Sequence, residues 1–272
     1  MPKAADRPVV NLRRAYFECR YGQLHVRTSF PSTGGFDERT PLVCLHEQPR
    51  SSRSFGAFLP VIGTDRSVYA CDTPGCGESD PPRGAPSIAD LAAAIGDFLD
   101  ALRLREADLF GVGGGAAIAA ELAIARPRGV RRLVLAAVPL VGGAARPVAG
   151  PWPVPPAADG SHLLAEWRRS IAARAGESLA ALAAGFVEEL GTGLTAPWAE
   201  ATVAAWAAAA RLPLVTQPVL LLRPRDPSAG SAAAAARLLR SATVEELAEL
   251  GPGYLASAPA TVATSVRRFL DR

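Results

Sequence analysis

The chain has 272 residues, of which 49% are hydrophobic and 20% charged, as in a globular protein with a large core. Its 29 basic and 26 acidic residues nearly cancel, and a net charge of +3 in scattered arginines argues against nucleic acid or an anionic membrane as a partner. No apolar run reaches the ~20 residues of a transmembrane helix. The N-terminal sequence has no apolar signal region, so we expect a cytoplasmic protein.

The first half of the chain alternates apolar runs with amphipathic segments. Residues 15–20 and 23–30 flank a Tyr-Gly turn and predict a β-hairpin. A helix is expected after Ser87, which forms a capping-box pattern with Asp90, and an alanine-rich helix extends to about residue 125. Four continuous apolar runs are typical of strands buried on both faces of a sheet: 41–45, 67–71, 109–112 and 133–138. The alternation predicts an α/β fold with a mostly parallel, doubly wound sheet.

The alternation stops at Pro139. A proline-rich stretch to residue 160 precedes three predicted helices, at 161–174, 177–190 and 198–211. Strands and helices then resume, at 218–222, 231–240, 243–247 and 259–270. We predict an α/β core formed by residues 1–138 and 212–272, and a helical lid formed by residues 139–211, which we call the lid segment. Inserted helices of this kind usually cover the carboxyl ends of the strands, where ligands bind.

Three segments resemble the α/β-hydrolase superfamily. Leu45-His46-Glu47-Gln48-Pro49 follows a buried strand, like the family's His-Gly-X-Pro oxyanion loop, with Glu47 where glycine is usual. Residues 72–79 (DTPGCGES) match the family turn D-x-P-G-x-G-x-S, the most specific of the three signals. Residues 108–115 (DLFGVGGG) lie where the nucleophile elbow G-x-S-x-G belongs. The resemblance covers nearly the whole chain and implies the α/β-hydrolase fold with an inserted helical lid.

The catalytic triad of this family is degenerate here. Gly113 stands at the nucleophile position, and glycine accepts the strained angles of an elbow, so the turn can persist without a nucleophile. Alignment places either Pro252 or Tyr254 at the histidine position, and no histidine occurs after His162. Asp226 is the candidate remnant acid, with an ordinary turn aspartate as the alternative. We therefore do not expect a serine hydrolase.

A substrate site is still expected at the elbow. The backbone amides of Gln48 and Gly114 should face it, because main-chain oxyanion donors outlast the loss of side chains. No cysteine or histidine spacing suggests a metal, and we expect no cofactor. The remaining predicted substrate contacts are His46, Glu47, Arg50, Val112, Gly113, Trp167 and Tyr254.

Several residues admit two interpretations. Cys76 lies in the turn at the expected pocket rim and is either a replacement nucleophile or an ordinary thiol. His25 is expected to be structural, and His162 is either a solvated helix start or a base. Residues 111–116 also fit the dinucleotide pattern G-x-G-x-x-A, but arginines at 131 and 132 stand where that fold needs an acidic residue. The lid tryptophans either pack the lid or line a wide apolar pocket.

Three classes of function fit a hydrolase scaffold without nucleophile and base: an enzyme that needs only positioning, a ligand-binding or regulatory pseudoenzyme, and a hydrolase with a relocated nucleophile. In its loss of the triad serine and histidine and in its aromatic lid, the chain is similar to the atypical α/β-hydrolase-fold peptide epimerases of bottromycin biosynthesis. That resemblance implies a natural-product (RiPP) isomerase whose substrate is a modified peptide with an aspartate beside a thiazoline. The substrate's own carboxylate would remove the acidified α-proton. Loss of the serine and histidine would leave room for such a bulky substrate.

Overall fold

The computed structural model describes residues 10–31, 38–140, 153–174, 176–225 and 229–272. In these residues an eight-stranded sheet has the order β1-β2-β4-β3-β5-β6-β7-β8. β1 is antiparallel to β2 and β2 to β4, whereas the other neighbours are parallel. The strands are β1 (Val10–Cys19), β2 (Gly22–Pro31), β3 (Arg39–Leu45), β4 (Arg66–Cys71), β5 (Ala107–Val112), β6 (Val130–Ala136), β7 (Val219–Pro224) and β8 (Ala242–Leu247).

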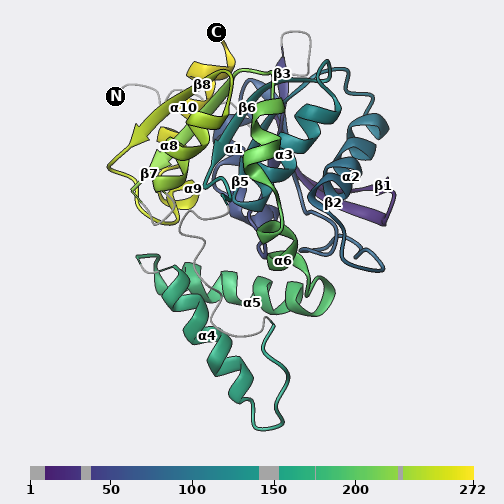
Figure 1. Ribbon diagram of the computed structural model, residues 1–272, viewed down its shortest axis with the longest axis vertical. Helices are drawn as coiled ribbons and strands as arrows, with labels where there is room; N and C mark the ends of the chain where they lie inside the picture. The colour runs from purple at the N-terminus through teal and green to yellow at the C-terminus, as the bar shows by residue number, and fades with distance from the viewer. Residues whose placement is uncertain (1–9, 32–37, 141–152, 175, 226–228) are drawn as a thin grey trace, which may run out of the picture.

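Helices pack on both faces of this sheet (Figure 1). One buried cluster lies under α2 (Ile88–Ala101), α3 (Gly114–Ala125) and α8 (Ala229–Leu238). The other lies under η1 (Ser52–Phe55), α1 (Leu59–Ile62), α9 (Tyr254–Ser257) and α10 (Pro259–Leu270). Successive residues of a strand point to opposite faces, so Leu109 joins the first cluster and Phe110 the second. The prediction of an α/β-hydrolase fold with a doubly wound sheet is confirmed.

Local sequence signals account for several element boundaries. The predicted hairpin forms with Cys19 opposite Gly22, whose φ of 114° suits a residue without a Cβ. The predicted capping box begins α2, because Asp90 N donates to Ser87 Oγ over 3.1 Å and Ser87 N donates to Asp90 Oδ2 over 3.0 Å. The short helices α1 and α9 were not expected, since four residues carry no helical periodicity.

The lid segment, between β6 and β7, forms a layer of its own beyond one end of the sheet (Figure 1). Its helices are α4 (Ser161–Ala173), α5 (Leu179–Thr195), α6 (Ala199–Ala204) and α7 (Ala208–Arg211), and η2 (Leu212–Leu214) follows them. The prediction of one helix at 198–211 is wrong, because the helix breaks at residues 205–207. Trp206 lies in this break, where its Nε1 donates to Glu121 of α3 over 2.8 Å.

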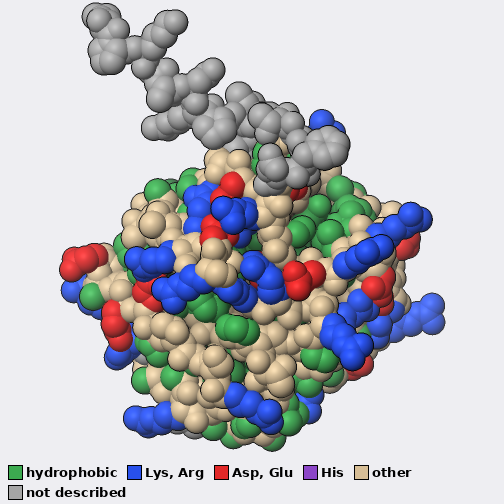
Figure 2. All heavy atoms as spheres, turned by 90° about the horizontal axis from the view of Figure 1, so that it is seen from above, with side chains coloured by type: hydrophobic (Ala, Val, Ile, Leu, Met, Phe, Trp, Pro, Cys, Tyr) green, Lys and Arg blue, Asp and Glu red, His purple; other side chains and the backbone are tan. Residues whose placement is uncertain are grey.

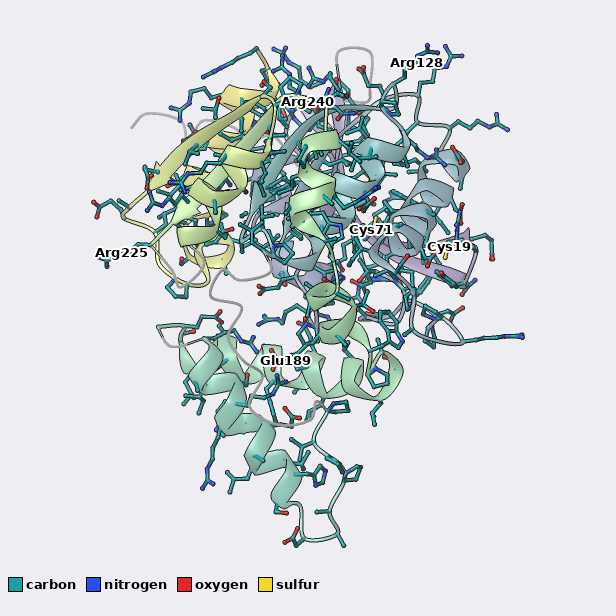
Figure 3. The ribbon with its side chains drawn as sticks, in the orientation of Figure 1. Cys19, Cys71, Arg128, Glu189, Arg225 and Arg240 are labelled. Carbon is teal, nitrogen blue, oxygen red and sulfur yellow. The ribbon has the colours of Figure 1, made fainter. Side chains whose placement is uncertain are left out.

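Arginine side chains gather on the end of the molecule opposite the lid segment, with acidic side chains interspersed (Figure 2). Arg128 and Arg240 lie at this end (Figure 3). Several arginines there are paired; Arg131 Nη2, for example, lies 2.5 Å from Asp108 Oδ2. No helix in the described part of the chain is long and apolar enough to cross a membrane.

Candidate functional site

The turn between β5 and α3 is sharp and centres on Gly113. Its φ of 57° and ψ of −125° lie in a region that only glycine adopts without strain. The turn is fixed on both sides, because Gly113 N donates to Ala136 O over 3.0 Å and Ala116 N donates to Gly113 O over 2.9 Å. This is the strand–turn–helix geometry that a nucleophile elbow requires.

Glu47 occupies the space beside Gly113. A Cβ at Gly113 would lie 2.8 Å from Glu47 Cβ and 3.9 Å from Glu47 Oε2. Real Cβ atoms essentially never come closer than 3.0 Å, so a serine at 113 and the glutamate at 47 exclude each other in this conformation. The expectation that loss of the serine leaves free space here is wrong. The Cβ of Glu47 lies where the nucleophile side chain would otherwise begin, and its carboxylate lies next to that position.

His46 fixes the loop that carries Glu47. Its ring is fully buried, Nε2 accepts a hydrogen bond from Thr73 N over 2.9 Å, and Nδ1 therefore donates to Glu47 O, also over 2.9 Å. Burial lowers the pKa of His46, which favours this neutral tautomer. The predicted substrate contact at His46 is thus a structural side chain that holds the backbone of Glu47.

The turn at 72–79 is also structural. Asp72 accepts hydrogen bonds from Ser52 N (2.6 Å), Glu78 N (2.9 Å) and His25 Nδ1 (2.8 Å). A Cβ at Gly77 would overlap the Asp72 carboxylate, which explains the glycine. Burial by itself raises the pKa of Asp72, but the His25 hydrogen bond, the nearby His46 and the two backbone donors together lower it to about 2.

Gln48 covers Gly114, the first residue of α3. A Cβ at Gly114 would overlap Gln48 Oε1 and would lie 2.6 Å from Val203 Cγ2 of α6. Gln48 Nε2 donates to Thr73 Oγ1 over 3.1 Å, whereas its Oε1 is buried and has no hydrogen-bond donor among the described residues. Gln48 Oε1 is therefore a buried acceptor beside the first residue of α3 that lacks a donor among the described residues.

An ion pair and a hydrogen bond connect the residues that follow the oxyanion loop to the lid segment. Arg50 Nε lies 3.7 Å from Glu188 Oε2, which also accepts a hydrogen bond from Ser51 Oγ over 2.9 Å. A Cβ at Gly185 of α5 would overlap Arg50 Nη1 and would lie 2.5 Å from Arg174 Nη1. Two guanidinium groups thus meet on the bare backbone of Gly185. The side chain of Arg50 is only 14% exposed, and it holds the lid as well as lining the expected site.

The loop at the histidine position contacts a second glutamate. Tyr254 is buried at the start of α9, and Pro252 is half-buried. A Cβ at Gly253 would lie 3.5 Å from Glu177 Cγ, and a Cβ at Gly176 would lie 3.5 Å from Pro252 Cγ. Figure 1 shows α9 facing the junction of α4 and α5, where Glu177 lies. Glu177 could not be predicted from the sequence, because it lies between two lid helices and belongs to no motif.

Three other candidates lie outside this arrangement. Trp167 of α4 packs edge-on against Phe186 of α5, with ring centroids 5.2 Å apart, so it belongs to the helix pair of the lid. Val112 is buried at the end of β5, in the second core cluster. Asp226 lies outside the described residues.

Cys76 and His162 have ordinary structural surroundings. Cys76 is 1% exposed, and burial raises the pKa of its thiol to about 12, so the thiolate that a nucleophile requires is disfavoured. His162 Nδ1 accepts a hydrogen bond from Ala157 N over 3.1 Å, at the first turn of α4. Neither residue is placed beside Gly113.

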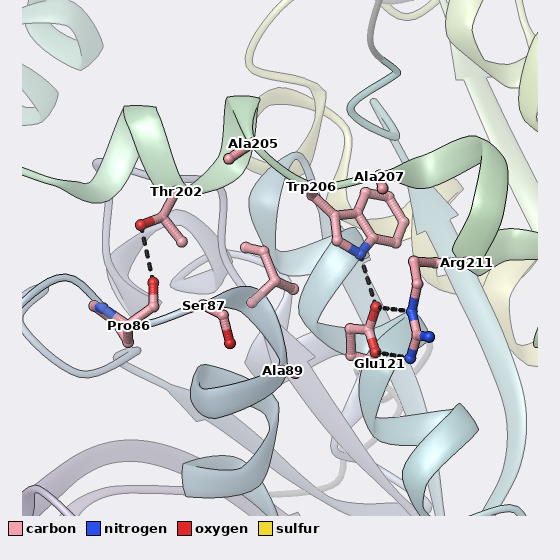
Figure 4. Close-up of a pocket in the computed structure, with 10 residues that line it drawn as sticks. Pro86, Ser87, Ala89, Glu121, Thr202, Ala205, Trp206, Ala207 and Arg211 are labelled. Atoms are coloured by element: carbon pink, nitrogen blue, oxygen red, sulfur yellow. Dashed lines mark hydrogen bonds and ion pairs between the residues drawn. The ribbon is translucent and has the colours of Figure 1, made fainter.

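Two cavities accompany the lid segment. A groove of about 430 Å³ lies between the start of α2 and the α6–α7 break, where Trp206 and Arg211 both bind Glu121 (Figure 4). A cavity of about 260 Å³ lies within the lid itself, between α4, α5 and residues 153–156. Neither is lined by Gly113 or Glu47. The described residues contain no group of three His, Cys, Asp or Glu side chains that could hold a metal ion.

The sheet order, the elbow and the inserted helices together define the α/β-hydrolase fold. Residues 40–167 match the family model described as alpha/beta hydrolase fold. This match spans just under half of the chain, and the solved structures described below share the fold.

Curated relatives match only part of the chain. This chain is 36% identical over 116 residues to 2-hydroxymuconate semialdehyde hydrolase of Pseudomonas sp. (strain CF600). The aligned residues cover 40% of this chain and 39% of that protein. It is 31% identical over 104 residues to proline iminopeptidase of Heyndrickxia coagulans, 36% of each chain. The match thus spans less than two fifths of the length of either relative.

Solved structures match over nearly the full length. Est816, described as an N-acyl homoserine lactone degrading enzyme, superposes with a TM-score of 0.75 at 19% identity, over 94% of this chain and 100% of that one. The esterase RhEst1 from Rhodococcus sp. ECU1013 gives a TM-score of 0.72 at 21% identity, over 96% and 98% of the two chains. At such identities the likeness concerns the fold alone.

Proposed function

We propose that this protein is a non-hydrolytic α/β-hydrolase-fold enzyme that catalyses proton transfer at a carbon atom, that is, an isomerase. The observation that carries the proposal is the contact between Glu47 and Gly113. The Cβ of Glu47 takes up the space that the Cβ of a nucleophile would need, so the elbow has neither a hydroxyl nor room for a serine in this conformation. The relatives named above are a hydrolase and a peptidase by name, and this chain has Gly113 where the family pattern has the nucleophile.

The positions of the histidines also support a non-hydrolytic function. The chain has three, and a serine nucleophile needs one of them as a base. His25 and His46 are buried and bonded to Asp72 and Thr73, and His162 lies in the lid segment. The loop at 251–254, where the catalytic histidine of the family would lie, contains none.

Proton transfer at carbon needs fewer catalytic groups than ester hydrolysis does. A C–H bond beside a C=N bond is acidic, because the electron pair delocalises as an enamine. Hydrogen-bond donors and acceptors around the elbow, including Gln48 Oε1, can hold such a group without forming a covalent intermediate.

We extend the proposal to a substrate class. The substrate is a modified peptide of a natural-product pathway, and the aspartate α-carbon beside its thiazoline is epimerised. The aspartate's own carboxylate accepts the α-proton, which the fixed geometry of a bound peptide favours.

Deuterium exchange tests the proposal. A synthetic peptide with an aspartate before a thiazoline, incubated with the protein in deuterated water, should gain one deuteron at the α-carbon and change configuration. The asparagine analogue should bind but not exchange. p-Nitrophenyl acetate should be cleaved no faster than by denatured protein, and a fluorophosphonate probe should label no serine. Stoichiometric labelling of a serine would contradict the non-hydrolytic assignment, and exchange of the asparagine analogue at the normal rate would contradict the substrate's role as base.

A catalytically inactive ligand-binding protein is the second candidate. Gln48 and Val203 cover Gly114, whereas an apolar cavity lined by Phe186 lies inside the lid. In that case an apolar peptide should raise the melting temperature and change tryptophan fluorescence without any exchange. Trp167→Ala should then weaken binding, because Trp167 supports Phe186 from behind.

A further inference from the structure

The lid segment contains a cavity of its own, separate from the elbow. The cavity has a volume of about 260 Å³ and lies between α4, α5 and residues 153–156. Much of its wall is apolar and includes Val154, Leu163, Phe186 and Leu190. An apolar cavity of about 150 Å³ is enough to bind benzene, so a ligand with one aromatic ring and a short side chain fits here.

The polar part of the cavity wall is acidic. Glu166 of α4 and Glu189 of α5 line the cavity, and the described residues of the wall include no arginine or lysine. His162 adds no positive charge, because its Nδ1 accepts a hydrogen bond from Ala157 N and is therefore unprotonated. A ligand in this cavity thus meets apolar side chains and two carboxylates.

The neighbouring arginine Arg169 does not fully neutralise the carboxylates it contacts. Its Nε donates to Glu166 over 2.8 Å and its Nη1 donates to Glu200, also over 2.8 Å, so one guanidinium serves two carboxylates. Glu200 Oε2 is buried and receives no hydrogen bond from the described residues. A partly buried group with more carboxylates than guanidiniums favours the binding of a further cation.

Glu189 has an oxygen left for such a cation. It lies near the middle of α5 (Figure 3), and its side chain is 11% exposed. Its Oε1 pairs with Arg174, whereas no described donor bonds to its Oε2. Glu166 has both oxygens occupied, by Val154 N over 2.6 Å and by Arg169, so it contributes through its charge. Glu189 Oε2 is therefore the group that can accept a charge-assisted hydrogen bond from a ligand.

We propose that the lid cavity is a binding site for an apolar organic ammonium ion, about the size of one aromatic ring with a short charged side chain. The ammonium group pairs with Glu189, and the apolar part of the ligand fills the space beside Phe186 and Leu190. A carboxylate ligand would be repelled by the two acidic side chains. The inference does not depend on the proposed isomerase function, because neither Gly113 nor Glu47 lines this cavity.

The helix that carries Glu189 also joins the lid segment to the core. Glu188 accepts a hydrogen bond from Ser51 Oγ over 2.9 Å, and Glu189, the next residue, lines the cavity. One side of α5 thus contacts the core while another side forms the proposed site. A bound amine should therefore reduce amide exchange in α5.

Probes of similar shape and different charge test the site. 2-Phenylethylamine, 2-phenylethanol and phenylacetate are titrated into the wild-type protein at pH 7, and binding is measured by calorimetry and by hydrogen exchange. The amine should bind about fivefold more tightly than the alcohol, as one ion pair would give, and phenylacetate should not bind. Protection should appear in α4 and α5 and not in α6 or α7, which border the other groove.

Two substitutions separate the charge of the site from its shape. Glu189→Gln keeps the shape of the side chain and removes its charge, so it should weaken amine binding about fivefold and change alcohol binding less than twofold. Leu190→Trp fills the cavity and should weaken the binding of both probes. Glu249→Gln is the control, because Glu249 is exposed and lies outside the lid segment. It should bind both probes as the wild type does.

A further probe distinguishes two sources of the ammonium group. L-Phenylalanylglycine amide carries the same phenyl ring and ammonium group on its first residue. Tighter binding of this dipeptide than of 2-phenylethylamine would assign the site to the N-terminus of a peptide. Weaker binding would assign it to a free amine. Both results support an ammonium site.

Several results would overturn the inference. Equal affinity for the amine, the alcohol and phenylacetate would show that the acidic wall recognises no charge. Unchanged amine binding by a Glu189→Gln protein with a wild-type melting temperature would remove the role of Glu189. Protection confined to α6 and α7 would place the amine in the groove beside Glu121 instead. A wild-type protein that does not bind the amine would lack the site, whereas deuterium exchange of the aspartyl-thiazoline peptide would still test the proposed function separately.

Discussion

His25 and Asp72 form a buried pair, with 2.8 Å between Nδ1 and Oδ2, that joins β2 to the turn after β4. The carboxylate also holds the backbone of Ser52 and Glu78, so one side chain fixes the start of η1 and the turn after β4 relative to β2. The charged form of Asp72 is therefore part of the folded state.

Acid should weaken this fold through Asp72. Its pKa falls from the usual 3.8 to about 2 in the folded state, so its contribution to stability is full above about pH 4 and is lost as the pH falls toward 2. A shift of this size corresponds to about 2 kcal/mol. Urea unfolding at pH 3 and pH 5 should show a smaller difference for Asp72→Asn than for wild type, whereas Glu106→Gln should keep the wild-type difference. An unchanged difference in Asp72→Asn would contradict the assignment.

Gly113→Ser should destabilise the protein without creating a hydrolase. The serine Cβ would lie 2.8 Å from Glu47 Cβ, and the positive φ adds strain, so we expect a loss of about 1–3 kcal/mol. Adding Glu47→Gly should recover part of that loss, because it removes the clash and leaves the strain. Chemical denaturation of the four proteins in a double-mutant cycle measures the coupling. Additive effects of the two substitutions would mean that the side chains do not meet.

Two glycines of α5 should respond in opposite ways to alanine. Gly185→Ala places a methyl group against the Arg50 and Arg174 guanidiniums and should cost about 1–3 kcal/mol. Gly191 has no atom within 4 Å of its Cβ position, so Gly191→Ala should stabilise the helix by about 0.5–1 kcal/mol. Melting temperatures distinguish the two directions. If both variants shifted alike, the contact between Gly185 and the arginines would be absent.

Glu121 anchors the end of the lid segment to the core. Its carboxylate accepts hydrogen bonds from Trp206 Nε1 (2.8 Å) and from Arg211 Nε and Nη2 (both 2.7 Å) (Figure 4). Glu121→Ala should lower stability by about 2 kcal/mol and increase amide exchange across α6 and α7. Trp206→Phe keeps the Arg211 pair and should have the smaller effect. Unchanged exchange in α6 and α7 would show that the anchor lies elsewhere.

The cysteines should be largely unreactive in the folded protein. Cys44, Cys71 and Cys76 are buried, and burial raises the pKa of each thiol, whereas Cys19 is half-buried. Titration with Ellman's reagent at pH 8 should detect at most one thiol before denaturation and all four after it. Rapid reaction at Cys76 would revive the hypothesis of a relocated nucleophile.

The sequence predicted the fold well because its local signals agree with the tertiary structure. The alternating hairpin, the Ser87–Asp90 capping box and the buried apolar runs each specify an element through short-range chemistry. The prediction of a single helix at 198–211 was wrong because the local sequence there does not specify the break. Alanines give no boundary signal, and the break is held by Trp206 bonding to Glu121, 85 residues away in sequence.

The candidate site was harder to predict. Gly113 and Glu47 were both recognised as departures from the family pattern, but the sequence could not show that one fills the space left by the other. Two compensating departures in loops that meet at the elbow were the available signal. Glu177 gave no signal, because its proximity to Gly253 depends on how the lid packs.

The lid segment interrupts the chain between two strands that are already partners. β6 and β7 pair directly, from Leu133 with Val219 to Ala136 with Leu222, so the ladder of backbone hydrogen bonds is complete without any lid residue. Changes in length or sequence between these two strands should therefore leave the register of the sheet unaltered. Selection on the inserted helices can then proceed separately from selection on the sheet that carries them.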